Sequence, residues 1–279
     1  MTSRTSFAPG KIILSGEYAV LFGYSGIGIP SHAGIEVVFE EDAACDGIEI
    51  NWVTPPVWLS YAHKVVELCR EERGEIRGKL SIHSTLPLGK GMGSSTTLAV
   101  AVVRALLGED ARETALDIEN TLSPGNSGFD FAAIWQGAPI LYRKGEVQPI
   151  ELPAQLLRSA VLIDTGTPGE STNELVAWMK GRESEIQEFL DTIGNCTERL
   201  MRGEPFGTVV RDHHKAQVAL GVVPSEAQQL IVAIESAGGA GKVIGAGSRT
   251  GGAGMVLALG DEKTIGDIAR KWHMPTMTP

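Results

Sequence analysis

The stretch GKGMGSSTT (residues 89–97) places three glycines at alternate positions and follows them with two serines and two threonines. Glycine lets backbone N–H groups approach an anion closely, and a helix N-terminus adds partial positive charge. The stretch therefore predicts either a phosphate cradle or a tight, well-capped strand-to-helix turn. Its flanks place it between a strand and a helix: residues 79–85 alternate like a strand, and residues 95–107 predict a mostly buried helix closed by Gly108.

Two common nucleotide-binding motifs do not match this stretch. A Walker A loop has lysine directly before its hydroxyl residue, where this chain has Gly93. A dinucleotide fingerprint has its last glycine one residue later and an acidic residue about 20 positions on, where Arg112 and Glu113 fall in a predicted helix. What remains is a glycine-rich cradle opening a helix whose Ser94 and Ser95 can cap the helix, donate to phosphate or ligate a metal.

The composition is that of an ordinary globular protein. Of the 279 residues, 43% are hydrophobic and 21% are charged, and the formal net charge is −10. This charge argues against nucleic acid and anionic membranes as partners, whereas a small anionic substrate needs only a few local donors. The sequence shows neither a secretory signal nor an apolar run of roughly 20 residues, so we expect a cytoplasmic protein. Three cysteines without C-x-x-C spacing are expected to be reduced and mostly buried: Cys45, Cys69 and Cys196.

The first half of the chain has mainly strand-like patterns and the second half mainly helical ones. Strands are predicted at 11–23, 34–41, 47–53, 79–85 and 159–166, a hairpin at 138–152, and two short strands within 238–260. Helices are predicted at 56–74, 95–107, 111–121, from about Asp130, and near 171–180, 182–202, 206–220 and 224–237. The change from strands to helices predicts a domain boundary near residue 150.

Three segments in order carry a more specific resemblance: APGK (8–11), LPLGKGMGSSTTLA (86–99) and KVIGAGSRTGGAG (242–254). Together they resemble the three motifs of the GHMP kinases, small-molecule kinases named for galactose, homoserine, mevalonate and phosphomevalonate. Within that family, APGKIILSGEYAVLFGY (8–24) and DTGTPGEST (164–172) are most similar to the mevalonate and phosphomevalonate members. The motifs are spread over nearly the whole chain, so the resemblance concerns the whole protein.

The resemblance implies an α/β (α+β) architecture, the GHMP kinase fold. Residues 1–150 would form an N-terminal domain that resembles ribosomal protein S5 domain 2 and binds ATP at the glycine loop 89–95. Residues 151–279 would form a helix-rich α/β C-terminal domain, with ATP and Mg²⁺ in the cleft between the two.

The resemblance also implies roles for matching positions. Lys11 would contact the transferred phosphate or the substrate hydroxyl, and Asp130 would be the catalytic aspartate. Glu119 would bind Mg²⁺ together with Ser94 or Ser95. The remaining implied contacts are, for ATP, Pro87, Gly89, Lys90, Gly91, Gly93, Ser94, Ser95 and Thr96, and, for the substrate, Glu17, Tyr18, Ser127, Asp130, Thr165, Gly245, Ala246 and Gly247.

The implied reaction moves the γ-phosphate of ATP to the 5-hydroxyl of mevalonate, a step of isoprenoid biosynthesis. Two departures from the family pattern leave phosphomevalonate kinase as the alternative. Tyr18 stands where mevalonate kinases commonly have histidine, and Arg249 lies within an interruption of the third glycine motif, where it could bind a phosphate or face solvent. Two more distant hypotheses are a non-catalytic GHMP-fold ligand sensor and a dinucleotide-dependent oxidoreductase. A homodimer is compatible with the sequence.

Overall fold

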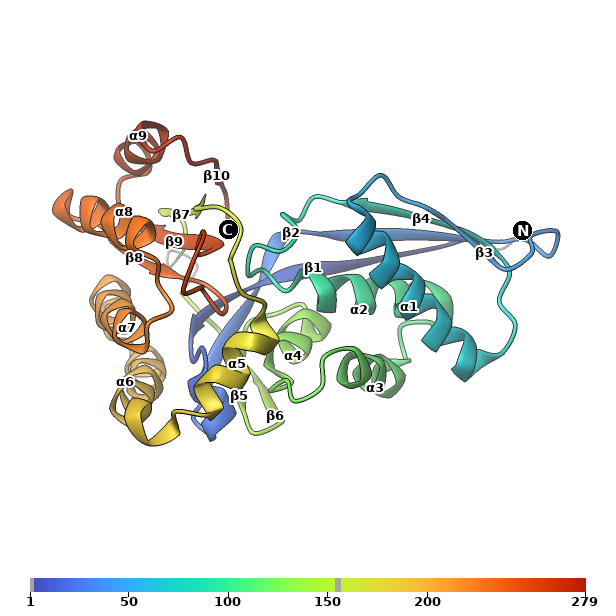
Figure 1. The fold of residues 1–279 in the computed structure, drawn as a ribbon, viewed down its shortest axis with the longest axis horizontal. Helices are drawn as coiled ribbons and strands as arrows, with labels where there is room; N and C mark the ends of the chain where they lie inside the picture. Colours follow the sequence, from blue (N-terminus) through green and yellow to red (C-terminus); the bar gives the residue numbers. More distant parts are fainter. Residues whose placement is uncertain (1–2, 154–156) are drawn as a thin grey trace.

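Two long antiparallel strands open the chain in the computed structural model, which describes residues 3–153 and 157–279 (Figure 1). β1 (Ser3–Ser15) pairs with one edge of β2 (Gly26–Glu41) along most of its length. The other edge of β2 is shared: Ile35–Glu41 pair with β4 (Gly78–Ser84) and Gly26–Gly28 with β5 (Ile140–Arg143). β3 (Ile48–Asn51) and β6 (Glu146–Pro149) complete this sheet in the order β3-β4-β2-β5-β6.

Helix α2 (Ser94–Leu107) fills the core beside this sheet. Every residue from Thr96 to Val103 is buried, because the run is almost entirely apolar and the helix packs against β1, β2 and three other helices. These three helices are α1 (Pro56–Arg73), α3 (Arg112–Leu122) and α4 (Phe129–Gln136).

A second, four-stranded antiparallel sheet lies at the other end of the molecule, in the order β10-β7-β9-β8 (Figure 1). Its strands are β7 (Ala160–Asp164), β8 (Ala240–Val243), β9 (Met255–Leu259) and β10 (Thr276–Met277). The helices of this half are α5 (Thr172–Lys180), α6 (Glu183–Met201), α7 (Phe206–Leu220), α8 (Ser225–Ser236) and α9 (Glu262–Lys271). The mixed α/β class expected from the sequence is confirmed.

Most predicted elements occur within a few residues of their expected bounds, and two differences have clear causes. The strand predicted at 11–23 ends at Ser15, and the 3-10 helix η1 (Ala19–Phe22) follows. Positive φ angles at Gly16 (110°) and Tyr18 (62°) turn the chain there, which apolar periodicity does not reveal. The sequence patterns considered above do not predict α9, although the side chain of Asp261 caps its first turn.

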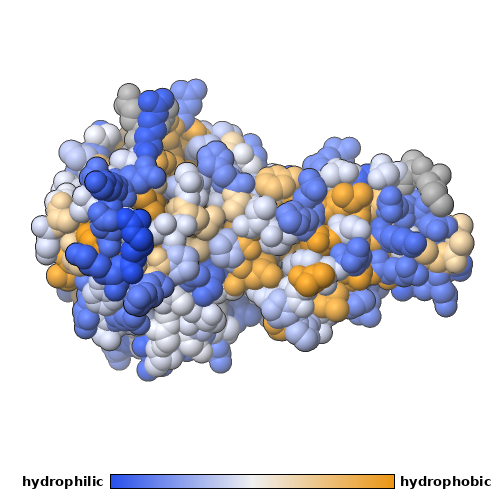
Figure 2. Space-filling view, turned by 90° about the horizontal axis from the view of Figure 1, so that it is seen from above, coloured by the Kyte–Doolittle hydropathy of each residue, from blue (hydrophilic) through white to orange (hydrophobic). Residues whose placement is uncertain are grey.

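Large apolar side chains are exposed on both halves of the protein. The three cysteines are free and buried, as expected. Among the exposed large apolar side chains, Phe7, Val53 and Val57 belong to the N-terminal half, and orange apolar residues interrupt the blue surface of that half in Figure 2. Among the described residues, no helix combines the length and apolar character needed to span a bilayer.

The glycine loop after β4 is held by backbone contacts from both halves of the chain. On one side, the Lys11 N–H donates to the Met92 carbonyl (3.0 Å). On the other, the Met255 N–H donates to the Lys90 carbonyl (3.0 Å). Gly254 allows this second contact, since a Cβ there would lie 2.6 Å from the Lys90 oxygen. The loop is therefore fixed between β1 and the start of β9.

Substituting Gly254 should destabilise the protein through this contact. Gly254 has φ +75°, so Gly254→Ala adds both left-handed strain and a backbone clash. We expect it to lower the free energy of unfolding by about 3 kcal/mol in denaturant titrations. Gly238→Ala is the matched control, because Gly238 has φ +87° with open space around its Cβ position. A loss of about 1 kcal/mol in both variants would show that only the backbone strain matters.

Candidate active site

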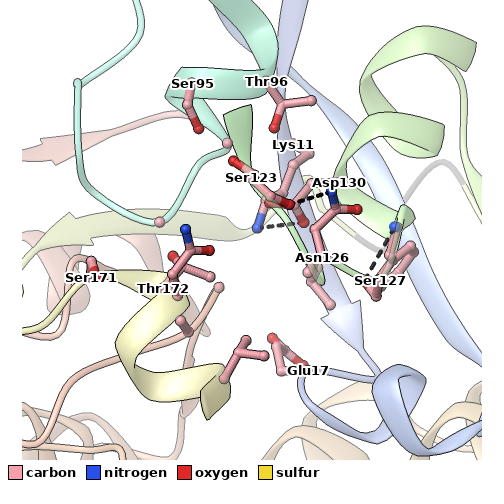
Figure 3. Close-up of a pocket in the computed structure, with 18 of the residues that line it drawn as sticks. Lys11, Glu17, Ser95, Thr96, Ser123, Asn126, Ser127, Asp130, Ser171 and Thr172 are labelled. Carbon is pink, nitrogen blue, oxygen red and sulfur yellow. Dashed lines mark hydrogen bonds and ion pairs between the residues drawn. The ribbon is translucent and has the colours of Figure 1, made fainter. Parts of the chain in front are cut away.

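A cavity of about 500 Å³ lies between the glycine loop, α4, the β1–η1 turn and the start of α5. Figure 3 shows Ser95 and Thr96 of α2 on one side of it, Lys11 and Asp130 in the middle, and Ser171, Thr172 and Glu17 on the opposite side. These side chains come from elements far apart in the sequence. The cavity thus has a glycine-loop end and an α5 end, with Lys11 and Asp130 between them.

At the glycine-loop end, three glycines adopt conformations that other residues rarely adopt. Gly89, Gly91 and Gly93 have φ angles of 72°, 81° and 78°. The Ser94 hydroxyl closes the loop on itself, accepting from the Gly89 N–H (3.1 Å) and donating to the Pro87 carbonyl (3.3 Å). The backbone N–H groups of the first turn of α2 lie beside this closed loop. A glycine loop followed by a helix N-terminus is an arrangement that binds anions.

Lys11 and Asp130 form an ion pair in the middle of the cavity, with 3.2 Å between Nζ and Oδ1. Lys11 is 2% exposed and Asp130 is 38% exposed, so the carboxylate faces the open space while the ammonium is held behind it. Gly93 leaves room for the lysine, because a Cβ there would lie 3.1 Å from Lys11 Cγ. The pair combines a fixed cation with an accessible proton acceptor.

Glu119 of α3 is a buried carboxylate whose two oxygens differ in their hydrogen bonding. Its Oε1 accepts from the Thr96 hydroxyl (2.8 Å), while its buried Oε2 has no hydrogen-bond partner among the described residues. Burial raises the pKa of Glu119 to about 7, against the lowering effect of the Thr96 hydrogen bond and with a smaller raising effect from Asp130. An unpartnered buried oxygen of this kind is suited to a cation brought in by a ligand.

Glu17 borders the α5 end of the cavity, and its carboxylate contacts two side chains from the second half of the chain. Oε1 contacts Lys242 of β8, and Oε2 lies 2.9 Å from His213 Nε2 of α7. Burial alone would raise the pKa of Glu17, yet Lys242 and His213 hold it at about 2. This buried cluster ties the end of β1 to the second sheet, since Lys242 also donates to the Ile13 carbonyl (3.0 Å).

The comparisons with known proteins agree on one family. The family model described as the GHMP kinases N terminal domain matches residues 60–138. The mevalonate kinase of Thermococcus gammatolerans is 30% identical over 291 residues, covering 86% of this chain and 85% of the relative. The chain belongs to the mevalonate kinase family of GHMP kinases.

Solved structures of this family share the fold over nearly the entire chain. The Methanococcus jannaschii mevalonate kinase superimposes with a TM-score of 0.82 at 17% identity, covering 99% of this chain and 97% of that one. The Streptococcus pneumoniae phosphomevalonate kinase, in complex with phosphomevalonate and AMPPNP, gives 0.77 at 18% identity with full coverage of both chains. The GHMP kinase fold is thereby confirmed, and the fold alone does not distinguish the two acceptors.

The structure brings most of the implied site residues to the cavity and leaves three outside its lining. The residues at the cavity are Lys11, Glu17, Tyr18, Gly89, Gly91, Gly93, Ser94, Ser95, Thr96, Glu119, Ser127, Asp130, Gly245, Ala246 and Gly247. Outside it, Pro87 only accepts the Ser94 hydrogen bond, and Lys90 pairs with Asp164 (3.1 Å). The Thr165 hydroxyl donates to the Gly254 carbonyl (2.8 Å). These three residues support the loops instead of facing the cavity, and the division at residue 150 stays a prediction.

Two implied substrate residues reach the cavity with their side chains already engaged. The Tyr18 hydroxyl donates to the Ala246 carbonyl and so connects the β1–η1 turn to the third glycine motif. Burial raises the pKa of Tyr18, so the hydroxyl stays protonated as a donor. The Ser127 hydroxyl accepts from the Phe129 N–H (3.3 Å) at the start of α4.

Sequence patterns did not assign several residues that line the same cavity. They include Trp58, Ser123, Asn126, Glu170 and Asn173. A capping signal was present for α5: the Ser171 hydroxyl accepts from the Glu174 N–H, and the Glu174 carboxylate accepts from the Ser171 N–H. That pattern predicts a helix start, while its location at a cavity depends on tertiary packing.

The raised pKa of Glu119 should appear as a pH-dependent stability. Because the folded state keeps the proton up to about pH 7 and the unfolded state releases it near 4.5, stability falls as pH rises through this window. Relative to Glu119→Gln, we expect the free energy of unfolding of the parent protein to fall by about 3 kcal/mol between pH 4.5 and 7.5. The measurement is urea unfolding of both proteins in EDTA. A difference between them that does not change with pH would contradict the assignment.

Proposed function

We propose that this chain is a mevalonate kinase that transfers the γ-phosphate of ATP to the 5-hydroxyl of mevalonate. The observation that carries the proposal is the Lys11–Asp130 pair, placed between the anion-binding glycine loop and the α5 end of one cavity. The named relatives support the choice of acceptor, because those at nearly full coverage, including the 30% identical protein, are called mevalonate kinase.

The glycine loop and the first turn of α2 bind the ATP phosphates through backbone N–H groups. The acceptor alcohol lies on the other side of Lys11 and Asp130, with its hydroxyl against the exposed Asp130 carboxylate. As the hydroxyl oxygen bonds to the γ-phosphorus, its proton passes to Asp130 and the bond from that phosphorus to the β–γ bridging oxygen breaks. ADP leaves with that oxygen, and Lys11 neutralises charge on the transferring group.

Glu119 and Ser95 are the residues that would hold Mg²⁺. The fit depends on the buried, unpartnered Oε2 of Glu119 and on Ser95 at the same end of the cavity. Ser94 is less suited, since its hydroxyl already closes the glycine loop. Among the described residues there is no cluster of three or more acidic, histidine or cysteine side chains for a metal, consistent with an ion that takes most of its ligands from phosphates and water. When bound, Mg²⁺ would neutralise phosphate charge.

The charges around the cavity favour mevalonate over its 5-phosphate as acceptor. Within residues 3–153 and 157–279, Lys11 is the only lysine or arginine that lines the cavity, and it is already paired with Asp130. A phosphomonoester acceptor adds about two negative charges at neutral pH, which need cationic or N–H partners to offset their desolvation. Mevalonate carries a single carboxylate and needs fewer such partners.

A coupled assay of ADP release tests the proposed reaction. Mevalonate, mevalonate 5-phosphate, homoserine and galactose are each supplied with ATP and Mg²⁺. We expect mevalonate to give the largest kcat/KM, at least about 100-fold above the other three, since about 3 kcal/mol of lost acceptor contacts suffices for that ratio. Turnover with the 5-phosphate alone would establish phosphomevalonate kinase instead. Nucleotide binding without turnover on any acceptor would favour a sensor.

Replacing the Asp130 carboxylate should remove turnover while keeping the fold. In Asp130→Asn the amide oxygen can still accept from Lys11, but it cannot take the hydroxyl proton. We expect kcat to fall by about 10²–10⁴-fold and the thermal unfolding midpoint to change little. Asp110→Asn, at an exposed position before α3, is the charge-matched control. A kcat within about tenfold of the parent value would exclude Asp130 as the base.

A further inference from the structure

The third glycine motif is interrupted by Ser248, Arg249 and Thr250, and all three contact the segment that leads into α5 or α5 itself. These residues lie in the connection between β8 and β9, about 80 positions from the start of α5. The residues at the start of α5 line the acceptor end of the cavity. The interruption therefore connects two loops of the second sheet at the acceptor site.

Glu170, two positions before α5, is the first connection. Its carboxylate accepts from the Arg249 N–H (2.9 Å), the Thr250 N–H (3.3 Å) and the Thr250 hydroxyl (2.9 Å), and it lies 2.6 Å from the Ser248 hydroxyl. These hydrogen bonds, that of Ser248 most of all, lower the pKa of Glu170 to about 2. The carboxylate is thus an ionised acceptor in a nest of four donors.

Arg249 makes the second connection with its side chain. Its guanidinium lies over the ring of Trp178, 4.5 Å from the centroid, and Trp178 belongs to α5. Arg182, which follows α5 directly in the chain, lies over the same ring at 4.2 Å. The two arginines differ in what they connect: Arg249 joins α5 to the β8–β9 connection, whereas Arg182 joins α5 to the start of α6, where it pairs with Glu185 (3.0 Å).

Just before α5, backbone hydrogen bonds join the two segments: the Gly169 N–H donates to the Thr250 carbonyl (3.0 Å) and the Gly252 N–H to the Thr167 carbonyl (2.9 Å). The first turn of α5 itself has its side chains in solvent. Leu175 and Met179 are buried in the core, but Ser171, Thr172, Asn173 and Glu174 are exposed. The Ser171–Glu174 capping box and the side-chain contacts of Glu170 add to these backbone bonds in holding the first turn. A change in the connection between Glu170 and residues 248–250 therefore shifts the wall that the acceptor contacts.

We propose that Glu170 and Arg249 are positioning residues for the acceptor alcohol: by joining the β8–β9 connection to α5, they hold Thr172 and Asn173 against the acceptor end of the cavity. Arg249 then contacts neither nucleotide nor acceptor phosphate. The inference rests on the proposed function for the identity of the acceptor, while the connection itself is a property of the ligand-free protein.

Steady-state kinetics with ATP and mevalonate test the effect on the acceptor. For Arg249→Ala we expect KM for mevalonate to rise about 5–10-fold, as the loss of one cation–π contact permits, with kcat and KM for ATP within about twofold. Glu170→Ala should raise KM for mevalonate at least about tenfold, because four donors lose their acceptor. Arg249→Lys retains a cation over the ring and should give an intermediate KM.

Arg182→Ala is the matched control, since it removes the same type of side chain from the same Trp178 ring. Its KM for mevalonate should stay within about twofold of the parent value, because it leaves the β8–β9 connection intact. An equal rise in KM for Arg182→Ala and Arg249→Ala would overturn the proposal, as it would trace the effect to Trp178 alone. An equal rise in KM for ATP and mevalonate would also overturn it.

Amide hydrogen exchange of the ligand-free protein tests the connection without any acceptor. Residues 171–176 should exchange at least about fivefold faster in Arg249→Ala and Glu170→Ala than in the parent protein or Arg182→Ala. Unchanged exchange in both variants overturns the proposal whatever the kinetics show. If the parent protein does not phosphorylate mevalonate, the proposed function fails, and faster exchange still supports the connection. Faster exchange with an unchanged KM for mevalonate overturns the acceptor role.

Discussion

The site depends on the placement of one glycine loop against two strands from opposite ends of the chain. Lys11 of β1 donates its N–H to the carbonyl of Met92, and Met255 of β9 donates to Lys90. Gly91 and Gly245 come so close that a Cβ on Gly245 would lie 2.6 Å from the Gly91 oxygen. These contacts require backbone groups without side chains between them. They bring the first, second and third motifs together, so the phosphate end, the ion pair and the acceptor end form one cavity.

Two buried carboxylates of this cavity have pKa values shifted in opposite directions, and the difference lies in their partners. Glu17 is buried with Lys242 and His213 close by, so its pKa is lowered to about 2. Glu119 is buried with one hydroxyl donor, and no cation within residues 3–153 and 157–279 offsets the burial, so its pKa is raised to about 7. A carboxylate that is already paired with cationic side chains has a structural role, because its position is fixed. A buried carboxylate without such a partner can instead bind a cation that arrives with the nucleotide.

Much of the fold and part of the site follow from local patterns. The alternation in β4, the apolar run of α2 and the helical periodicities of the second half predict those elements to within a few residues. The resemblance of three ordered motifs indicates the family, and the comparisons confirm it. The turn at Tyr18 was missed because its positive φ is imposed by contacts with the rest of the chain, among them the hydrogen bond to the Ala246 carbonyl. The resemblance implies a substrate contact for Thr165, and sequence patterns do not show that its hydroxyl donates to the Gly254 carbonyl.

By itself, the sequence determined where glycines permit left-handed turns, where helices begin and which residues carry charge. Each of these properties depends on a residue and its near neighbours. The tertiary structure alone decided which charges meet: Glu17 with Lys242, Asp130 with Lys11, and Glu170 with residues 248–250. Such pairs lie about 80 to 225 positions apart. Strand register and helix packing select them, because a side chain of a few ångströms can reach only the groups that the folded backbone brings beside it.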